Sequence, residues 1–247
     1  MQQLNLISGK TKEQIAIEFI QEYEPEEGYF LGFSGGKDSV VLYDLAVKSG
    51  VKFQGYYSAT GIDAPEVVRF IKDNYPDVIF CRPKELFFKS LKRKDYPTKW
   101  NRWCCNTLKK EPTKHIPLLH RLMGIRAEES SRRAARGMTS KLNKWTIYKP
   151  IFTYKEWEIW DYIDNHKLPY CSLYDEGFHR LGCVVCPFIC GGNQINLDRH
   201  KQRWPKIYKA FEIAMKWTYE NNQNKSIEKA RRDMTFDEFL QNWYKGK

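Results

Sequence analysis

The sequence predicts an α/β protein with a doubly wound parallel sheet and a C-terminal helical, cysteine-containing extension. Short apolar runs typical of buried strands alternate with helical patterns from the N-terminus to Pro150. This alternation is typical of parallel strands joined by crossover helices. A glycine-rich loop directly follows the first apolar run, and a cysteine-rich segment interrupts the helical pattern after Pro150.

The elements of the first part follow in chain order. Apolar residues at helical spacing predict a first helix over residues 11–23, and the run Tyr29–Phe33 predicts the first buried strand. Pro65 favours the first turn of a later helix, because its missing N–H needs no partner there. The remaining expected elements are a helix over 38–48 and strands over 52–59, 78–81 and 118–125.

The part after Pro150 is expected to be mainly helical. We predict a helix over 154–166 with Trp157 and Trp160 in the core, and helical stretches at about 198–221 and 235–244. The irregular segment between them holds four of the seven cysteines. We therefore expect a first domain over residues 1–166 and an extension over 167–247 that does not fold independently.

Composition and charge limit the possible functions. The chain is 42% hydrophobic but has no run of 18 apolar residues, so we predict no membrane span. The polar stretch Met1–Lys12 has no signal-peptide core, which predicts a cytoplasmic protein. The formal charge of +11 favours an anionic partner such as nucleotide phosphates, sulfate esters or nucleic acid.

The loop Ser34–Ser39, with sequence Ser-Gly-Gly-Lys-Asp-Ser, is a candidate phosphate site. Gly35 and Gly36 let the backbone turn tightly and point its N–H groups into one concavity. The following helix adds the positive end of its dipole, and Ser34, Lys37 and Ser39 supply further donors. A Walker A loop is excluded, because position 31 is Leu and Asp38 follows Lys37.

Other candidates for the nucleotide site should lie near this loop. Ligands of parallel α/β sheets bind at the carboxyl ends of the strands. Thr60 and Asp63 follow the second expected strand, and Gly124 and Arg126 follow the fourth. We therefore expect these four residues to share the binding edge with the glycine loop.

The segment after Arg126 adds charged side chains. Arg126, Arg132 and Arg133 carry planar guanidinium groups that pair bidentately with sulfate or phosphate oxygens. Glu128 or Glu129 would orient these arginines or help to hold Mg²⁺. We predict that Arg126, Glu128, Arg132 and Arg133 contact the phosphate or substrate.

The cysteines favour a metal centre over disulfides in a chain predicted to be cytoplasmic. Cys183 and Cys186 form a Cys-x-x-Cys pair whose thiolates can converge on one ion or cluster. The vicinal Cys104 and Cys105 suit two irons of a larger cluster better than one zinc. These four residues are therefore predicted to hold a [4Fe–4S] cluster, with zinc or unligated redox-active thiols as alternatives. Cys190 is a further ligand, a nucleophile or a buried apolar residue.

Together these motifs resemble the phosphoadenosine phosphosulfate (PAPS) reductase family of the pyrophosphate-loop (ATP pyrophosphatase) superfamily. The resemblance implies an adenine nucleotide alpha-hydrolase-like fold, a pyrophosphate-loop nucleotide-binding domain over 1–166, and ATP or a PAPS-like nucleotide as ligand. It also implies the cysteine pairs of the iron–sulfur members. The segments that carry it are Ser34–Ser39, Gly61–Glu66, Trp103–Cys105, Gly124–Arg133 and Leu168–Pro187.

Two departures from the sulfonucleotide reductases of this family affect the expected reaction. Those enzymes use a cysteine on a C-terminal tail, whereas the last cysteine here is Cys190. Their loop is usually degenerate, whereas Lys37 and Asp38 are both present. We therefore expect ATP-dependent adenylation coupled to sulfur transfer, with Lys37, Asp38 and Cys190 in catalysis. Sulfur from the cluster or Cys190 would displace AMP.

Two alternatives remain open. One is a PAPS or adenylyl sulfate reductase that releases sulfite, with Cys190 or a partner's cysteine as nucleophile. The other is a nucleic-acid-binding subunit of a modification complex whose nucleotide site is regulatory. The expected partners are an adenine nucleotide, with tRNA or DNA and a sulfur-donor protein as further candidates.

Overall fold

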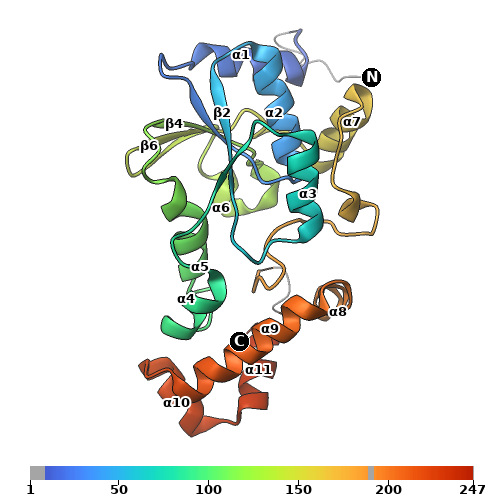
Figure 1. Ribbon diagram of the computed structural model, residues 1–247. Coiled ribbons are helices and arrows are strands. Elements are labelled where there is room, and N and C mark those ends of the chain that lie inside the picture. Colours follow the sequence, from blue (N-terminus) through green and yellow to red (C-terminus); the bar gives the residue numbers. More distant parts are fainter. Residues whose placement is uncertain (1–8, 189–191, 247) are drawn as a thin grey trace. The chain divides into compact units, whose positions relative to one another are not determined.

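The computed structural model describes residues 9–188 and 192–246 (Figure 1). The chain forms two compact units, and each is assembled from segments that are distant in sequence. Unit 1 comprises Met1–Tyr57, Glu66–Phe80 and Ile116–Leu181, and unit 2 comprises Ser58–Pro65, Cys81–His115 and Gly182–Lys247. The expected division of the chain at residue 166 stays a prediction.

A six-stranded sheet in the order β3-β2-β1-β4-β6-β5 forms the centre of the fold. β1 pairs in parallel with β2 and β4, and β4 pairs in parallel with β6. The edge strand β5 is antiparallel to its neighbour β6. The predicted α/β class is therefore confirmed. The strands are β1 (Tyr29–Gly32), β2 (Phe53–Ser58), β3 (Ile79–Cys81), β4 (His120–Met123), β5 (Thr139–Leu142) and β6 (Trp145–Tyr148).

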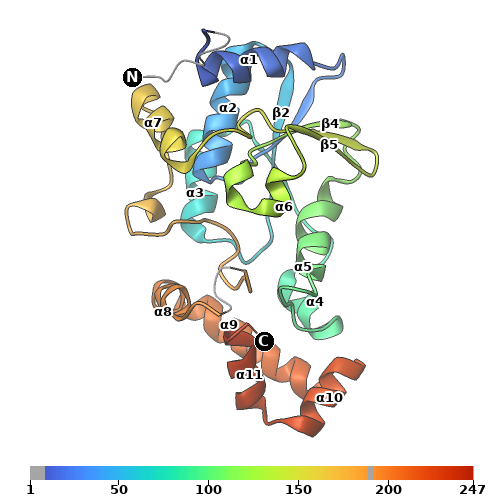
Figure 2. The same cartoon turned by 180° about the vertical axis from the view of Figure 1, so that it is seen from behind.

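Helices of unit 1 flank the sheet. α2 contacts both α1 and α7, and the three lie together in Figures 1 and 2. α1 begins at a capping box, in which the Thr11 hydroxyl accepts from the Gln14 N–H and the Gln14 side chain accepts from the Thr11 N–H. The helices are α1 (Lys12–Glu22), α2 (Lys37–Ser49), α3 (Pro65–Asn74), α6 (Ser131–Ala134) and α7 (Glu156–His166), with 3₁₀ turns at Ala127–Glu129 and Ser172–Tyr174.

The central strand β1 buries side chains on both faces of the sheet. Successive residues of a strand point to opposite faces. The Tyr29 hydroxyl donates to the Ile20 carbonyl of α1, at 3.0 Å. The ring of Phe30 stacks on Tyr56 with centroids 4.6 Å apart, and the Arg121 guanidinium lies 4.1 Å from the Phe30 ring centre. β1 therefore reads as a continuous apolar run because neither of its faces is exposed.

Unit 2 is mainly helical and joins two distant parts of the sequence. The rings of Phe87 on α4 and Phe211 on α9 lie 6.3 Å apart, and both side chains are buried. The Trp243 indole donates to the Pro97 carbonyl at 2.6 Å. The helices are α4 (Phe87–Arg93), α5 (Trp103–Cys105), α8 (Gln194–Arg203), α9 (Pro205–Asn221), α10 (Lys225–Asp233) and α11 (Phe236–Tyr244), with a π-helical turn at Asn106–Lys110 and a 3₁₀ turn at Glu111–Thr113.

Several expected elements need correction. The stretch 198–221 is not one helix, because α8 ends before Trp204 and α9 begins at Pro205. Proline has no N–H for an interior helical hydrogen bond, so it starts a new helix here. The β5–β6 hairpin, α4 and α10 were not predicted. The expected strand over 118–125 is the shorter β4.

No helix in the described part of the chain is long and apolar enough to cross a membrane.

Candidate functional site

The glycine loop lies at the point where the order of the sheet reverses. From β1 the chain builds outward through β2 and β3, and then returns to place β4 on the other side of β1. Gly32 of β1 is paired with Met123 of β4, so the two strands end at the same edge. The Ser34–Ser39 loop and the Gly124–Arg126 segment leave the sheet from this edge. Such a switch point is where open α/β sheets bind ligands.

Two glycines allow close packing at this edge. Gly35 has φ of +73°, and a Cβ there would lie 2.9 Å from a Val67 methyl group on α3. A Cβ on Gly124 would lie 3.0 Å from the Asp38 carbonyl oxygen. The first distance is shorter than real Cβ contacts and the second is unusually tight, so a side chain at either position would force its neighbours to shift.

The serines of the loop bind its own backbone. The Ser39 hydroxyl donates to the Gly36 carbonyl at 2.8 Å, and it accepts from the Ser34 N–H at 3.2 Å. The Ser34 hydroxyl accepts from the Gly36 N–H at 3.3 Å. These bonds hold the turn in shape before any ligand binds.

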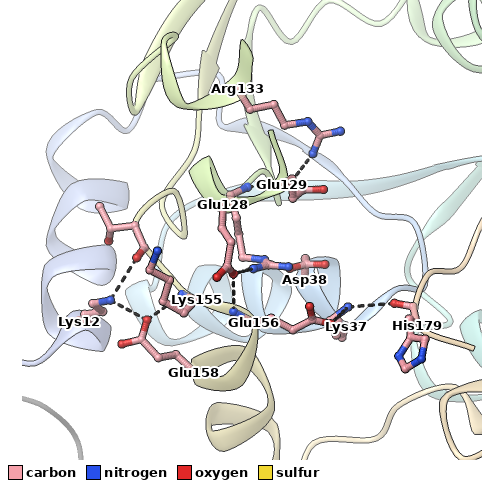
Figure 3. A network of polar contacts seen from close by, with 12 residues as sticks. Lys12, Lys37, Asp38, Glu128, Glu129, Arg133, Lys155, Glu156, Glu158 and His179 are labelled. Atoms are coloured by element: carbon pink, nitrogen blue, oxygen red, sulfur yellow. Dashed lines mark hydrogen bonds and ion pairs between the residues drawn. The ribbon is translucent and has the colours of Figure 1, made fainter. Parts of the chain in front are cut away.

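Lys37 places a buried charge at the start of α2. The residue is 5% exposed, and its ammonium lies 3.2 Å from a Glu156 carboxylate oxygen (Figure 3). It also donates to the His179 carbonyl at 3.3 Å. The ammonium lies 5.3 Å from the centre of the Tyr174 ring and 5.9 Å from that of Trp160. The ion pair and the ring contacts stabilise the buried ammonium.

Tyr174 also binds the backbone of the loop. Its hydroxyl accepts a hydrogen bond from the Lys37 N–H at 2.9 Å. The N–H group of Lys37 therefore points at an oxygen atom in the structure, as the loop motif predicts for a phosphate oxygen. Burial raises the pKa of the Tyr174 phenol, so the hydroxyl stays neutral.

Arg126 is a further buried cation at this edge of the sheet. Its Nε lies 2.5 Å from an Asp38 carboxylate oxygen, and its Nη1 lies 2.6 Å from a Glu128 carboxylate oxygen. The same Glu128 oxygen accepts the N–H of Glu156 at 2.7 Å (Figure 3). Burial disfavours the Arg126 charge, but Asp38, Glu128 and Glu129 outweigh burial and raise the Arg126 pKa. The network links the ends of β1 and β4 to the start of α7.

The pKa of Glu128 is lowered from its usual range. The largest cause is the hydrogen bond from the Glu156 N–H, and the Arg126 guanidinium adds to it. Glu128 is therefore ionised at neutral pH, and it remains available to orient Arg126 or to help hold a divalent cation.

The other predicted arginines differ from Arg126. Arg133 forms an ion pair with Glu129 within the same turn of chain, as Figure 3 shows. Arg132 is exposed on α6. Of the three predicted phosphate-binding arginines, only Arg126 is bound directly to a loop residue, Asp38.

Thr60 and Asp63 belong to unit 2. The Asp63 carboxylate accepts hydrogen bonds from the Thr60 N–H at 2.6 Å and from the Thr60 hydroxyl at 2.8 Å. Asp63 forms a β-bridge with Cys183, and the Thr60 hydroxyl lies 3.5 Å from the Cys183 sulfur. The structure therefore brings this segment against the cysteines, and its assignment to the nucleotide site stays a prediction.

The four predicted ligand cysteines share unit 2 and interact electrostatically. A hydrogen bond from the Cys104 thiol is the main cause that lowers the pKa of Cys105 to about 5, and Arg102 adds to it. The same bond is the main cause that raises the pKa of Cys104, where burial, Cys183 and Cys186 add to it. Burial raises the pKa of Cys183 to about 11. Cys105 therefore loses its proton more readily than Cys104 or Cys183 does.

Thiols are suitable ligands for a metal centre, but these side chains do not converge on one point in the structure. Thiolates suit iron–sulfur clusters and zinc. Across residues 9–188 and 192–246, however, no three His, Cys, Asp or Glu side chains converge closely enough to hold a metal ion. The predicted metal centre therefore stays a proposal. Cys190 lies outside the described residues.

Four residues of the loop environment were not predicted: Tyr174, Glu156, His179 and Trp160. They lie more than a hundred positions from Lys37 in sequence, and no sequence pattern linked them to the loop. Trp157 was expected in the core, but it is 60% exposed on α7. The aromatic pattern of α7 was therefore misread, because Trp160 turns toward Tyr174, with ring centroids 5.0 Å apart, and Trp157 turns to solvent.

A mainly parallel sheet with a phosphate-type loop at its switch point defines an adenine nucleotide alpha-hydrolase-like α/β protein. Two solved structures share this fold. The PAPS reductase of Candida auris, in a phosphate complex, aligns with a TM-score of 0.55 and 18% identity over 72% of this chain and 90% of that one. The FMN adenylyltransferase of Candida glabrata, in complex with FAD and pyrophosphate, aligns with a TM-score of 0.51 and 15% identity, covering 70% of this chain and 64% of that one.

The chain belongs to the phosphoadenosine phosphosulfate reductase family, whose domain pattern matches residues 28–188. An uncharacterized protein of Methanocaldococcus jannaschii is 30% identical over 83% of this chain and 45% of its own length. An adenosine 5′-phosphosulfate reductase of Staphylococcus epidermidis is 28% identical over 67% of this chain and 72% of its own length. The chain spans about half the length of the two Methanocaldococcus jannaschii relatives it matches.

Proposed function

We propose that this protein binds ATP at the Ser34–Ser39 loop and adenylates an acceptor before sulfur replaces the adenylate. One observation carries the proposal: Lys37 and Arg126 are buried cations at the edge where β1 and β4 end. Cations fixed at a switch point suit a phosphate chain. Membership of the PAPS reductase family makes an adenine nucleotide the expected ligand class.

The acidic partners of these cations support the same site. Glu156 contacts Lys37, while Asp38 and Glu128 contact Arg126. The Glu156 side chain is 51% exposed, so a phosphate oxygen could replace it at little cost. Asp38 and Glu128 are hard oxygen ligands of the kind that Mg²⁺ binds together with nucleotide phosphates.

The proposed first step transfers the AMP moiety. An oxygen of the acceptor attacks the α-phosphorus, the bond from this phosphorus to the bridging oxygen breaks, and pyrophosphate leaves. Lys37 and Mg²⁺ would neutralise the charge that develops on the leaving group. Electrostatic stabilisation by groups already held in place is the main source of catalysis in such reactions.

The proposed second step needs a sulfur donor. A hydrosulfide equivalent attacks the adenylated carbon, a C–S bond forms, the C–O bond breaks, and AMP leaves with the acceptor's oxygen. Cys104, Cys105, Cys183 and Cys186 would hold a [4Fe–4S] cluster, or alternatively zinc. Such a centre would supply a Lewis-acidic site for sulfur when bound. The role of Cys190 as nucleophile or ligand is part of the same proposal.

Binding of ATP and AMP to wild-type protein and Lys37→Met tests the nucleotide site. With Mg²⁺ present, we expect wild type to bind ATP at least about 10-fold more tightly than AMP. Lys37→Met should weaken ATP binding by about 10- to 100-fold and leave AMP binding nearly unchanged, since a charged hydrogen bond contributes about 1.5–3 kcal/mol. Lys141→Met, at an exposed residue of β5, is the matched control. Isothermal titration calorimetry measures the affinities of the three proteins for both nucleotides.

Equal affinities of the wild type for ATP and AMP would contradict a site that holds the outer phosphates. The reductase alternative predicts tighter binding of adenylyl sulfate than of ATP, and release of sulfite in the presence of a dithiol. In that reaction a thiolate attacks the sulfur, AMP leaves, and a second thiol releases sulfite as a disulfide forms. The similarity to adenosine 5′-phosphosulfate reductases keeps this alternative open.

A further inference from the structure

The net positive charge of the protein comes from unit 2. Unit 2 holds 23 Lys and Arg residues against 11 Asp and Glu, a formal charge of +12. Unit 1 holds 18 against 19, a formal charge of −1. The proposed nucleotide loop lies in unit 1, so the excess of cations is not explained by that loop. A second anionic partner is indicated for unit 2.

The basic residues next to the cysteine pair lack acidic neighbours in sequence. Residues 96–110 contain four cations and no Asp or Glu: Lys99, Arg102, Lys109 and Lys110. Arg102, Lys109 and Lys110 are exposed. Within the described residues no carboxylate forms an ion pair with any of the four. Lys109 interacts electrostatically with Cys183 and Asp63. The other three, which form no ion pair in the described residues, suit a chain of phosphates better than a neutral ligand.

The same stretch of sequence carries an exposed indole, that of Trp100. Trp100 is 92% exposed, the highest exposure of any large apolar side chain in the described structure. A tight turn presents it, because the Thr98 hydroxyl accepts the N–H groups of Trp100 at 3.1 Å and of Asn101 at 2.8 Å. Because the turn keeps the Trp100 indole exposed to solvent, its flat face is available for stacking.

Arg102, one of these cations, lies close to the Cys105 thiol. The Arg102 guanidinium lies 4.4 Å from the centre of the Phe188 ring, and its Nη2 lies 3.7 Å from the Cys105 sulfur. Phe188 is itself exposed. We name Lys99, Trp100, Arg102, Lys109, Lys110 and Phe188 the Trp100 surface. It combines cations, stacking groups and access to the cysteine pair within one unit.

We propose that the Trp100 surface binds a single-stranded polynucleotide, with one unpaired base stacked on Trp100 and neighbouring phosphates on the cations. Proteins that bind single strands combine a basic track with aromatic platforms, and each stacked base adds measurable affinity. An apolar protein partner does not fit, since Trp100 lies in a stretch of sequence that has four cations and no carboxylate. Because Arg102 of this surface lies 3.7 Å from the Cys105 sulfur, we infer that the strand is the acceptor class of the sulfur-transfer reaction. This last step rests on the proposed function.

Fluorescence anisotropy with labelled twelve-nucleotide probes tests the site on the full chain. We expect wild type to bind single-stranded RNA or DNA more tightly than the corresponding duplex. Trp100→Ala should weaken single-strand binding by about 5- to 100-fold, and Trp100→Phe should retain most of it. Trp157→Ala, which removes the exposed indole of unit 1, should leave binding unchanged. Far-UV circular dichroism checks that the variants are folded.

The salt dependence provides an independent readout of the phosphate contacts. Lys110→Gln should reduce the slope of log Kd against log salt concentration by about 0.7, the change expected for one phosphate contact with a single strand. Lys141→Gln should leave the slope unchanged. A surface that acts only through apolar contact would show no slope to reduce.

Equal affinities of Trp100→Ala and wild type, or tighter binding of the duplex, would overturn the proposal. ATP binding is measured on the same samples, and Trp100→Ala should retain it. Loss of strand binding with ATP binding retained would contradict the Trp100 surface alone. Strand binding with no ATP binding would contradict the proposed reaction and leave the surface standing.

Discussion

Lys37 illustrates how a phosphate-binding residue is held before its ligand arrives. A buried ammonium is costly unless other groups replace its water. Here the Glu156 carboxylate, the His179 carbonyl and the rings of Trp160 and Tyr174 do so. The Glu156 side chain is 51% exposed, so a phosphate can displace this carboxylate from the Lys37 ammonium.

Glu156→Gln should therefore strengthen ATP binding. The change removes a negative charge 3.2 Å from the Lys37 ammonium, and that charge would compete with the phosphates. Because exposed ion pairs contribute about 0.2–1 kcal/mol, we expect ATP affinity to rise by about 1.5- to 5-fold. Calorimetric titration of ATP at constant ionic strength measures the change.

Asp164→Asn provides the matched control, because it removes an exposed carboxylate from the other end of the same helix, α7. Its ATP affinity should equal that of the wild type. Weaker ATP binding by Glu156→Gln would mean that Glu156 assists the nucleotide, for example through Mg²⁺, instead of competing with it.

At the scale of elements, the loop depends on its packing against α3. Gly35 turns the chain with φ of +73° and brings it against Val67 and Ile71. Gly50, at the end of α2, has the same φ of +73°, but a Cβ added there would meet no atom within 4 Å. The two glycines therefore share a backbone conformation and differ in their surroundings.

Gly35→Ala should destabilise the protein more than Gly50→Ala does. The left-handed conformation alone costs an alanine about 1–2 kcal/mol, and we expect this loss of unfolding free energy for Gly50→Ala. Gly35→Ala adds overpacking against α3, which typically costs about 1–3 kcal/mol more. Urea unfolding of both variants and the wild type measures the difference. Equal losses would show that the loop yields without disturbing α3.

At the scale of the whole molecule, unit 2 depends on residues that precede the C-terminal helices by about a hundred positions. The Thr218 hydroxyl of α9 contacts the Leu91 carbonyl at 3.4 Å, and the Asn222 side chain donates to the Lys92 carbonyl at 2.8 Å. Phe87 and Leu91 are buried. The helices of the C-terminal extension therefore complete their core with residues from α4.

A fragment of residues 167–247 should not fold alone. It lacks α4 and the Pro97 carbonyl that binds Trp243, so Phe211 and its neighbours would be exposed to water. We expect low helicity by circular dichroism and poor dispersion of amide signals by NMR, compared with the full chain. A cooperative thermal transition of the isolated fragment would contradict this inference.

Local sequence patterns predicted much of the fold for identifiable reasons. Apolar spacing over residues 11–23 and Pro65 each predicted a helix through local chemistry, and the apolar run of β1 follows from burial on both faces. The β5–β6 hairpin was missed because its strands are only four residues each and β5 is largely exposed. The helical stretch expected over 198–221 is divided into α8 and α9 because Pro205 cannot continue the first helix.

The sequence by itself determined the α/β class, the glycine loop and the two cysteine pairs, because each depends on residues close together in the chain. Tertiary structure decided which groups meet Lys37 and Arg126, and that Asp63 pairs with Cys183. The Lys37 N–H and the Tyr174 hydroxyl that accepts it are 137 positions apart. Contacts over such separations depend on how strands and helices pack, and a local sequence pattern does not predict that packing.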